Sequence, residues 1–232
     1  MKRNACMWRI LIIRFLLMSL MVGGALFAAA GTWRWPSAWV YLITVVGLTF
    51  AGRVSVMRKN PDLITERAQS LKKENVKGWD RALMPLAAVI LPITILVAAG
   101  LDVRFGWTAP YEFKWRVAAL FAVVLGILVA NRAMVVNTFF SGTVRIQDER
   151  MHVVISDGPY RWVRHPSYSA AVLANIATPV LLGSLWALIF SGLFVAAIGV
   201  RTALEDRTLK SELYGYMEYS RQVRYRLFPG IW

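Results

Sequence analysis

Two short polar clusters stand out in a chain that otherwise consists largely of long apolar runs. The first, at 156–168, reads SDGPYRWVRHPSY and places Arg164 and His165 directly before an apolar stretch. The second reads RTALEDRTL and carries Glu205 and Asp206 at the far end of that stretch. Charged and imidazole groups at the mouth of a membrane helix are unfavourable unless they bind something. We therefore expect the two clusters to meet at one membrane face and enclose a charged ligand.

The two clusters offer complementary halves of a binding site. The guanidinium groups of Arg161 and Arg164 can hold a carboxylate or a phosphate. Pro166 can open a helix whose free backbone N–H groups also favour an anion. The carboxylates of Glu205 and Asp206 suit a cationic group. A zwitterionic cofactor with a sulfonium or ammonium centre matches this set.

The same residues also have a purely structural interpretation. Glu205 follows Arg201 by four residues, so the two can pair along one helix. Asp206 and Lys210 have the same spacing. His165 could serve only as a helix cap. The residues alone do not decide between these interpretations.

The composition indicates a membrane protein. Hydrophobic residues make up 57% of the 232 residues and charged residues 17%, and the apolar runs are long enough for several spans. The formal net charge is +14, but the basic residues lie at the ends of apolar runs, where membrane topology explains them, so we expect no nucleic-acid partner. Cys6 is the one cysteine, and His152 and His165 are the two histidines, so neither a disulfide framework nor a metal site is expected.

The apolar runs predict an all-α polytopic membrane protein with four transmembrane helices, a C-terminal transmembrane helical hairpin and a cytoplasmic C-terminal helix. A signal peptide is the alternative for the first run, but its apolar part is too long for a typical signal sequence. The hairpin is broken at Pro179 and at Gly183. The predicted ranges are 8–30, 36–57, 82–99 and 115–136 for the four spans, 168–203 for the hairpin and 205–226 for the last helix.

Two polar segments connect these elements. The segment 58–81 predicts an amphipathic helix on the membrane surface or on the protein's own loops, with a solvated connector as the alternative. The segment 139–166 mixes β-branched residues with turn formers, which predicts a compact loop with a small β-hairpin at 147–151. Arg132, near the end of the fourth span, can reach the membrane interface or face the ligand.

Lysine and arginine residues predict the orientation. They are abundant at the N-terminus, in both polar segments and in the C-terminal segment, and scarcer in the connections at 31–36 and 101–114. The positive-inside rule therefore puts both termini and both large loops in the cytoplasm. Four spans and a returning hairpin satisfy this arrangement and bring the two polar clusters to the same side.

The polar motifs resemble those of the isoprenylcysteine carboxyl methyltransferase family of integral-membrane methyltransferases, including its bacterial members. The similar stretches are GPYRWVRHPSY and LEDRTLKSELYGYMEYSRQVRYRLFPGIW, with RKNPDLITERA and VNTFFSGTVRIQDERMHVV closest to the bacterial branch. The resemblance implies N-terminal transmembrane helices at 1–57 and a methyltransferase core at 58–232. That core divides into a cytoplasmic loop at 58–81, transmembrane helices at 82–136, a cofactor loop at 139–166, the hairpin at 168–203 and the helix at 205–226.

The resemblance implies methyl transfer from S-adenosylmethionine to a lipophilic or small acceptor, a carboxylate or thiol, in a bacterial inner membrane with the active-site mouth facing the cytoplasm. Glu205 and Arg164 are the catalytic candidates. Glu205 would hold the cofactor's amino group or orient the reacting centre, and Arg164 would bind the cofactor's carboxylate. Asp206 stands where the family often has a glutamate, one methylene longer. The implied cofactor-binding residues are Tyr160, Arg164, His165, Pro166, Tyr168, Glu205, Asp206 and Leu209.

Two other classes share some of these features. Membrane sterol reductases have a similar tail with an Arg-His motif, acidic residues and an ending like 225–229, and they use NADPH. The chain is short for a sterol reductase, and its RHPSY is closer to the methyltransferase form. A non-catalytic membrane protein is the third interpretation. The methyl acceptor and the oligomeric state stay open.

Overall fold

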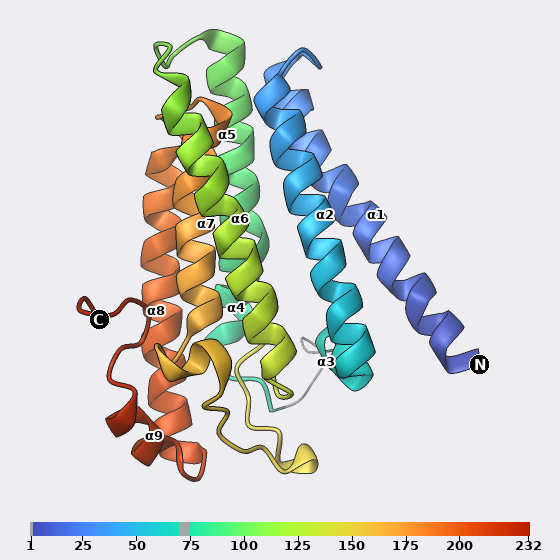
Figure 1. Ribbon diagram of the computed structural model, residues 1–232, viewed down its shortest axis with the longest axis vertical. Coiled ribbons are helices and arrows are strands. Elements are labelled where there is room, and N and C mark those ends of the chain that lie inside the picture. Colours follow the sequence, from blue (N-terminus) through green and yellow to red (C-terminus); the bar gives the residue numbers. More distant parts are fainter. Residues whose placement is uncertain (1, 70–74) are drawn as a thin grey trace.

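The computed structural model describes residues 2–69 and 75–232, and over these residues the regular structure is entirely helical. The long helices stand side by side in one bundle (Figure 1). The α-helices are α1 Lys2–Ala30, α2 Pro36–Lys59, α3 Pro61–Gln69, α4 Asp80–Pro85, α5 Leu91–Phe105, α6 Phe113–Val136, α7 Pro166–Leu182, α8 Leu188–Glu212 and α9 Tyr216–Gln222.

Five stretches of the described chain are long and apolar enough to cross a membrane. Helix α7, with 17 residues, is apolar but shorter, and it forms a hairpin with the fifth of these stretches. The predicted class, four spans followed by a helical hairpin, is therefore confirmed. The five stretches are Leu11–Ala30, Pro36–Lys59, Asp80–Phe105, Phe113–Val136 and Leu188–Glu212.

The third span contains a π-helical turn. Helices α4 and α5 are joined without a break through Leu86–Ile90, which has π-helical hydrogen bonding and lies between Pro85 and Pro92. Proline removes a backbone donor, and a wider turn is one way to accommodate that loss. The span continues to Phe105, beyond the predicted end at residue 99, because Gly100 is held inside the helix against α1 and the left-handed Gly106 ends it.

The hairpin turns at Gly183 and not at Pro179. Gly183 has φ +92°, a left-handed conformation that favours glycine, and it ends α7. Pro179 lies within α7 and leaves the carbonyl of Asn175 without its usual helical donor. The Ser191 hydroxyl on α8 donates to that carbonyl at 2.7 Å. The predicted break at Pro179 is therefore wrong, because the facing helix replaces the missing hydrogen bond.

Helix α6 packs closely on α7. Gly126 on α6 lies against the backbone of α7, so that a Cβ atom built there would stand 2.7 Å from the carbonyl oxygen of Ala170. This close approach needs glycine at position 126. It fixes the start of α7, where the arginine–histidine cluster lies, against α6.

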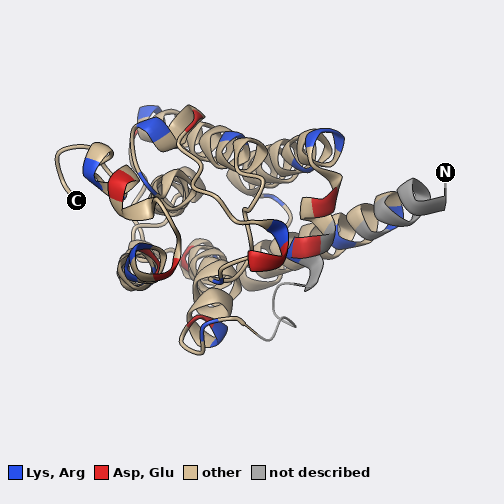
Figure 2. Cartoon of the chain, turned by 90° about the horizontal axis from the view of Figure 1, so that it is seen from below, with Lys and Arg blue, Asp and Glu red and all other residues tan. Residues whose placement is uncertain are grey.

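Both chain termini and the large polar loops lie at one end of the bundle, with the short connections at the other end (Figure 1). Figure 2 looks onto the end with the termini, where charged residues are spread over the helix ends and the loops. The relative sidedness predicted from the lysine and arginine distribution is therefore present. The two polar clusters share this end.

Two local predictions differ from the structure, and one agrees in part. The predicted helix at 205–226 is instead the continuation of α8 to Glu212, a turn at Gly215 with φ +80°, and the short α9. The β-hairpin predicted at 147–151 is a 3₁₀ turn over Asp148–Arg150. The segment 58–81, described here without 70–74, contains helix α3.

Helix α3 packs on the protein's own helices. Its residues Leu63 and Ile64 are buried against Val56 and Met134. Of the interpretations left open for the segment 58–81, the structure therefore shows an amphipathic helix whose apolar face lies on the protein.

Candidate functional site

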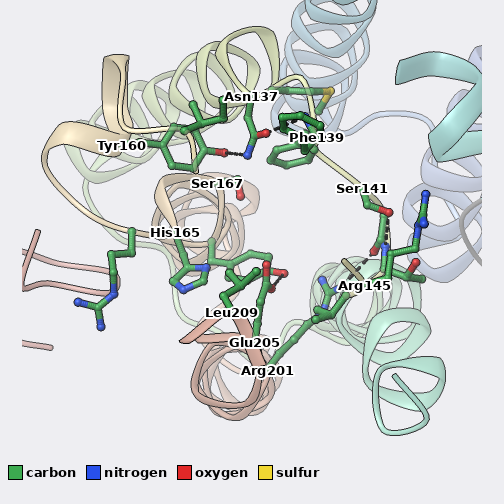
Figure 3. Close-up of a pocket in the computed structure, with 18 of the residues that line it drawn as sticks. Asn137, Phe139, Ser141, Arg145, Tyr160, His165, Ser167, Arg201, Glu205 and Leu209 are labelled. Carbon is green, nitrogen blue, oxygen red and sulfur yellow. Dashed lines mark hydrogen bonds between the residues drawn. The ribbon is translucent and has the colours of Figure 1, made fainter. Parts of the chain in front are cut away.

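One cavity of about 350 Å³ lies between the loop that connects α6 to α7 and the C-terminal half of α8 (Figure 3). Its walls come from the loop after α6, the start of α7, the end of α8 and helix α9. This volume falls within the range of about 300–1,000 Å³ typical of small-molecule sites. The described residues that line it include Tyr160, His165, Tyr168, Glu205 and Leu209.

The two polar clusters meet directly in a buried ion pair. Arg164 donates from Nε to Oδ1 of Asp206 at 2.7 Å and from Nη2 to Oδ2 at 3.1 Å. Both side chains are almost fully buried, with exposed fractions of 4% and 1%. The Nη1 atom of Arg164 donates to the carbonyls of Val223 and Arg224, each at 2.8 Å. All three nitrogens of this guanidinium therefore have protein acceptors.

Asp206 is the centre of a larger network. Its carboxylate also accepts from Arg226 at 3.0 Å, from the Tyr216 hydroxyl at 3.1 Å and from Lys210 at 3.2 Å. The Nε2 atom of His165 lies 3.6 Å from the same carboxylate. The predicted Asp206–Lys210 pair is thus present, but as one part of a network that ties α7, α8 and the C-terminal segment together.

Glu205 has different surroundings, because it lines the cavity. Its Oε2 atom accepts a hydrogen bond of 2.5 Å from the Tyr168 hydroxyl. The His165 ring stacks on the Tyr168 ring, with centroids 5.6 Å apart and planes inclined by 5°. The guanidinium of Arg201 stands 5.3 Å from the centre of the Tyr168 ring. Tyr168 thus links the carboxylate, the imidazole and the second arginine.

Arg201 pairs with Asp80. The helical spacing predicts a pair with Glu205 instead. The Nε atom of Arg201 donates to Asp80 at 2.7 Å, and its Nη2 atom donates to the carbonyl of Gly142 at 3.0 Å. Asp80 in turn accepts from the backbone N–H of Val144 at 2.7 Å. This buried pair therefore holds the 142–144 part of the cavity wall on α8.

The sequence interpretation missed the role of Asp80. Asp80 lies 121 residues before Arg201, near the end of the segment 58–81, for which the sequence predicts a connector or a surface helix. The available signal was an acidic residue at the first position of a membrane span, where a charge needs a partner or water.

The loop before α7 is held by two tyrosines and an asparagine. The Tyr219 hydroxyl donates to the carbonyl of Tyr160 at 2.7 Å, and Asn137 donates to the Tyr160 hydroxyl at 3.1 Å. Burial raises the pKa of the Tyr160 phenol, so it stays protonated at neutral pH. Both tyrosine rings line the cavity.

The C-terminal segment fixes the RHP motif through its backbone. The N–H groups of Arg164 and His165 donate to the carbonyls of Tyr225 and Arg226 at 3.0 Å and 2.9 Å. Pro166 then begins α7, as predicted. His165 occupies the N-cap position, but its side chain makes no capping hydrogen bond. Its imidazole is instead available to the Asp206 network and the cavity.

Comparison with known proteins agrees with this arrangement. Residues 117–211 match the model of the isoprenylcysteine carboxyl methyltransferase family, a range that includes both polar clusters. The chain is similar to this family over that range.

Two curated relatives are similar to this chain over part of its length. Protein-S-isoprenylcysteine O-methyltransferase B of Arabidopsis thaliana is 28% identical over 105 residues, which are 44% of this chain and 53% of the relative. Protein-S-isoprenylcysteine O-methyltransferase of Schizosaccharomyces pombe is 31% identical over 113 residues, 47% of this chain and 48% of the relative. The aligned part thus spans about half the length of these relatives.

A solved structure shares the fold of this chain. It is that of a eukaryotic intramembrane Ras methyltransferase, an isoprenylcysteine carboxyl methyltransferase, with a TM-score of 0.58 and 18% identity. The match covers 91% of this chain and 73% of the other. At this identity the likeness shows a common fold for the bundle.

The predicted site residues of this chain divide into two groups. Most of them line the cavity, whereas Pro166 starts α7 and Asp206 lies behind Arg164. Arg132 is exposed and is not among the lining residues, whereas Arg67 of α3 is. In the described part of the chain no group of three or more metal-ligating side chains occurs. The predicted residues that line the cavity are Tyr160, Arg164, His165, Tyr168, Glu205 and Leu209.

Proposed function

We propose that this protein is an integral-membrane methyltransferase that uses S-adenosylmethionine and modifies a lipophilic or small acceptor bearing a carboxylate or a thiol. One observation carries the proposal. The carboxylate of Glu205, positioned by Tyr168 at 2.5 Å, lines the same cavity as the arginine–histidine motif, 40 residues away in the sequence. The match of residues 117–211 to the family model supports the same activity.

The cavity suits the charged part of this cofactor. Glu205 has one carboxylate oxygen bonded to Tyr168, and the other can accept from the cofactor's amino group. The rings of Tyr160 and Tyr219 and the side chain of Leu209 offer apolar walls. The backbone at the start of α7, beside His165, favours the cofactor's carboxylate. When bound, the cofactor supplies a methyl group on a positively charged sulfur.

We assign Arg164 and Asp206 to positioning. A guanidinium whose three nitrogens all donate to protein groups is a poor candidate for a direct contact with the cofactor's carboxylate. The pair instead holds His165 and Glu205 on the same wall of the cavity. Arg164 therefore contributes to catalysis through the residues that it places.

The far part of the cavity suits a lipophilic acceptor. Its lining there is mainly apolar and includes Met84, Ala87 and Ala88 at the π-helical turn, with Ala130 and Met134 from α6. A carboxylate or thiolate acceptor needs no proton removed before it attacks the methyl group. The chain then has to place the acceptor and exclude water, which are substantial sources of rate acceleration.

The proposed location is a bacterial inner membrane, with both termini and the mouth of the cavity in the cytoplasm. The basic residues at the end that carries the termini support this orientation through the positive-inside rule. The lipid bilayer would supply a lipophilic acceptor laterally.

A binding test separates the proposed activity from its rivals. We expect S-adenosylhomocysteine to raise the melting temperature of the purified protein in detergent and NADPH to leave it unchanged. Stabilisation by NADPH alone would indicate a reductase, and no response to either ligand would indicate a non-catalytic protein. Incubation of membranes with a labelled methyl donor, followed by identification of the labelled product, then identifies the acceptor.

A further inference from the structure

A second cavity, of about 210 Å³, lies between α1, α2 and α3. Three arginines from three different helices line it, namely Arg14, Arg53 and Arg67. The rest of its wall is mostly apolar, with Phe15 and Ile64 among the contributors. Among the described residues that line it there is no carboxylate. A small cavity with several guanidinium groups and apolar walls fits an anion attached to an apolar chain.

The position of two of these arginines within apolar helices adds to the argument. Arg14 and Arg53 both lie inside stretches that are long and apolar enough to cross a membrane. Positive charges within such stretches are unfavourable and are typically found where they bind something. Burial, followed by the neighbouring positive charge of Arg53, lowers the pKa of Arg67 to about 9. An anion between these groups would relieve their mutual repulsion.

Arg53 is the most informative of the three residues. Its Nη1 atom contacts the thioether sulfur of Met134, which is only a weak hydrogen-bond acceptor. Arg14 and Arg67 have further interactions within the protein, so the argument and its test are placed on Arg53. Arg67 also lines the cavity that contains Glu205, so the two cavities share a side chain as part of their walls.

We infer that the cavity of Arg14, Arg53 and Arg67 binds the acidic group of an amphiphile, a phosphate or a carboxylate, whose apolar chain lies along α1 and α2 in the bilayer. The site is a binding site in its own right and holds whether or not the larger cavity transfers methyl groups. Its specificity is for negative charge combined with an apolar chain. A free anion has the negative charge but no apolar chain. A zwitterionic lipid has the apolar chain, but its negative charge is balanced by a positive one.

The test uses the full chain in a non-ionic detergent and three probes. These are dioctanoyl phosphatidic acid, dioctanoyl phosphatidylcholine with the same chains, and inorganic phosphate. We expect phosphatidic acid to bind at least about tenfold more tightly than either of the other two, as expected for one charge-assisted contact. Native mass spectrometry gives the affinities, and thermal unfolding gives an independent measure.

The matched variants are Arg53→Gln and Arg58→Gln. Both positions are on α2, but Arg58 is exposed and lines neither described cavity. We expect Arg53→Gln to weaken binding of phosphatidic acid about tenfold and Arg58→Gln to leave it unchanged. Circular dichroism and gel filtration confirm that each variant is folded. If Arg53→Gln does not fold, Arg14→Gln is measured in its place with the same expectation.

Three outcomes would overturn the inference. Equal binding of the two lipids would remove the requirement for net charge, and equal binding of inorganic phosphate would remove the requirement for an apolar chain. Equal losses in Arg53→Gln and Arg58→Gln would show a general surface effect. Binding of S-adenosylhomocysteine, measured on the same samples, reports on the proposed methyltransferase activity separately.

Discussion

Glu205 and Asp206 are neighbours in the sequence but have different surroundings. Successive residues of an α-helix point about 100° apart, so the two side chains can face different surroundings. Glu205 faces the cavity beside Tyr168, whereas Asp206 faces the buried arginines. An acidic pair on a helix thus provides one carboxylate for a ligand and one for the protein.

The first prediction concerns Glu205. Replacement of Glu205 by Gln should weaken binding of S-adenosylhomocysteine by about 1–3 kcal/mol, because a hydrogen bond to a charged group is lost. The fold should be preserved, since Tyr168 can still donate to the amide oxygen. Isothermal titration calorimetry in detergent measures the change. Glu212→Gln on the same helix, where Glu212 pairs with Lys77 at the surface, is the control and should bind normally. Unchanged affinity in Glu205→Gln would remove Glu205 from the cofactor site.

The second prediction concerns Asp206. Replacement of Asp206 by Asn leaves Arg164 buried without its bidentate partner and should destabilise the fold by about 3–5 kcal/mol. Chemical unfolding in mixed micelles measures this loss. Asp157→Asn breaks an exposed pair with Arg161 and should change stability by no more than about 0.5 kcal/mol. A stable Asp206→Asn protein that fails to bind S-adenosylhomocysteine would instead point to a direct ligand contact.

The third prediction is a pH dependence from His152. Burial, followed by the charge of Arg145, lowers the pKa of His152 to about 4 from its ordinary value of 6.5. The unfolded chain therefore binds a proton at a higher pH than the folded protein, so this residue should lower stability as the pH falls from 6.5 to 4. Melting temperatures measured from pH 7.5 to 4 should fall less steeply in His152→Gln than in the wild type. Parallel curves would contradict the assignment.

The neighbours of His152 are consistent with its neutral form. Its ring lies 4.6 Å from that of Phe139, and its Nδ1 atom is an acceptor at 3.5 Å from the backbone N–H of Gln147. The charged groups that also act on it are Arg145, Asp148, Glu149 and Arg150. The comparison of the wild type with His152→Gln separates the contribution of His152 to the pH dependence from that of these charged groups.

Helix α6 illustrates how contact between elements positions the site. The fourth prediction is that Gly126→Ala destabilises the protein by about 1–3 kcal/mol, since the added carbon overpacks the contact with α7. A Cβ atom there would meet the carbonyl oxygen of Ala170 at 2.7 Å, and a backbone atom cannot move without moving α7.

The control for Gly126 is Gly192 on α8. A Cβ atom at Gly192 would meet nothing within 4 Å, so Gly192→Ala should raise stability by up to about 1 kcal/mol through helix propensity. Thermal unfolding in detergent compares the two variants. Equal stabilisation of both would show that α6 and α7 do not pack as closely as described.

The elements were predictable where apolar length decides them. Each span had a long apolar run, and Pro166 marked the start of α7 correctly. The 3₁₀ turn at Asp148–Arg150 was not predictable, because the β-branched residues around it pack on helices and not on a partner strand. The end of α8 was also missed, since helix-forming residues continue past the predicted boundary until Gly215.

The fifth prediction belongs to the whole molecule. With both termini at the end that carries the basic loops, a fluorescent reporter fused to either terminus should be fluorescent in the cytoplasm of a bacterial host. A cysteine introduced at Glu112, in the connection at the opposite end, should react with a membrane-impermeant thiol reagent in intact cells, in a background where Cys6 is replaced by Ser. Reaction from the cytoplasmic side only would reverse the proposed orientation.

At this scale the sequence predicted which clusters meet but not the contacts between them. Arg164 and Glu205 were expected at one site because topology returns the chain to the same side. The pairing of Arg201 with Asp80 joins positions 121 residues apart, and no local pattern indicates it. Such partners depend on how the helices are arranged around the bundle, which single-helix periodicity does not encode.

The π-helical turn at Leu86–Ile90 sets a rotation as well as a width. If these five residues formed an ordinary α-helix without loss of a residue, everything on their N-terminal side would turn by roughly 100° around the axis. Asp80 would then no longer point at Arg201, and the wall at 142–144 would lose its anchor. The π-helical hydrogen bonding of Leu86–Ile90 is therefore under a stricter constraint than the identity of the small residues within it. Substitutions that keep the wide turn can be neutral, whereas a change to α-helical hydrogen bonding at the same length is not.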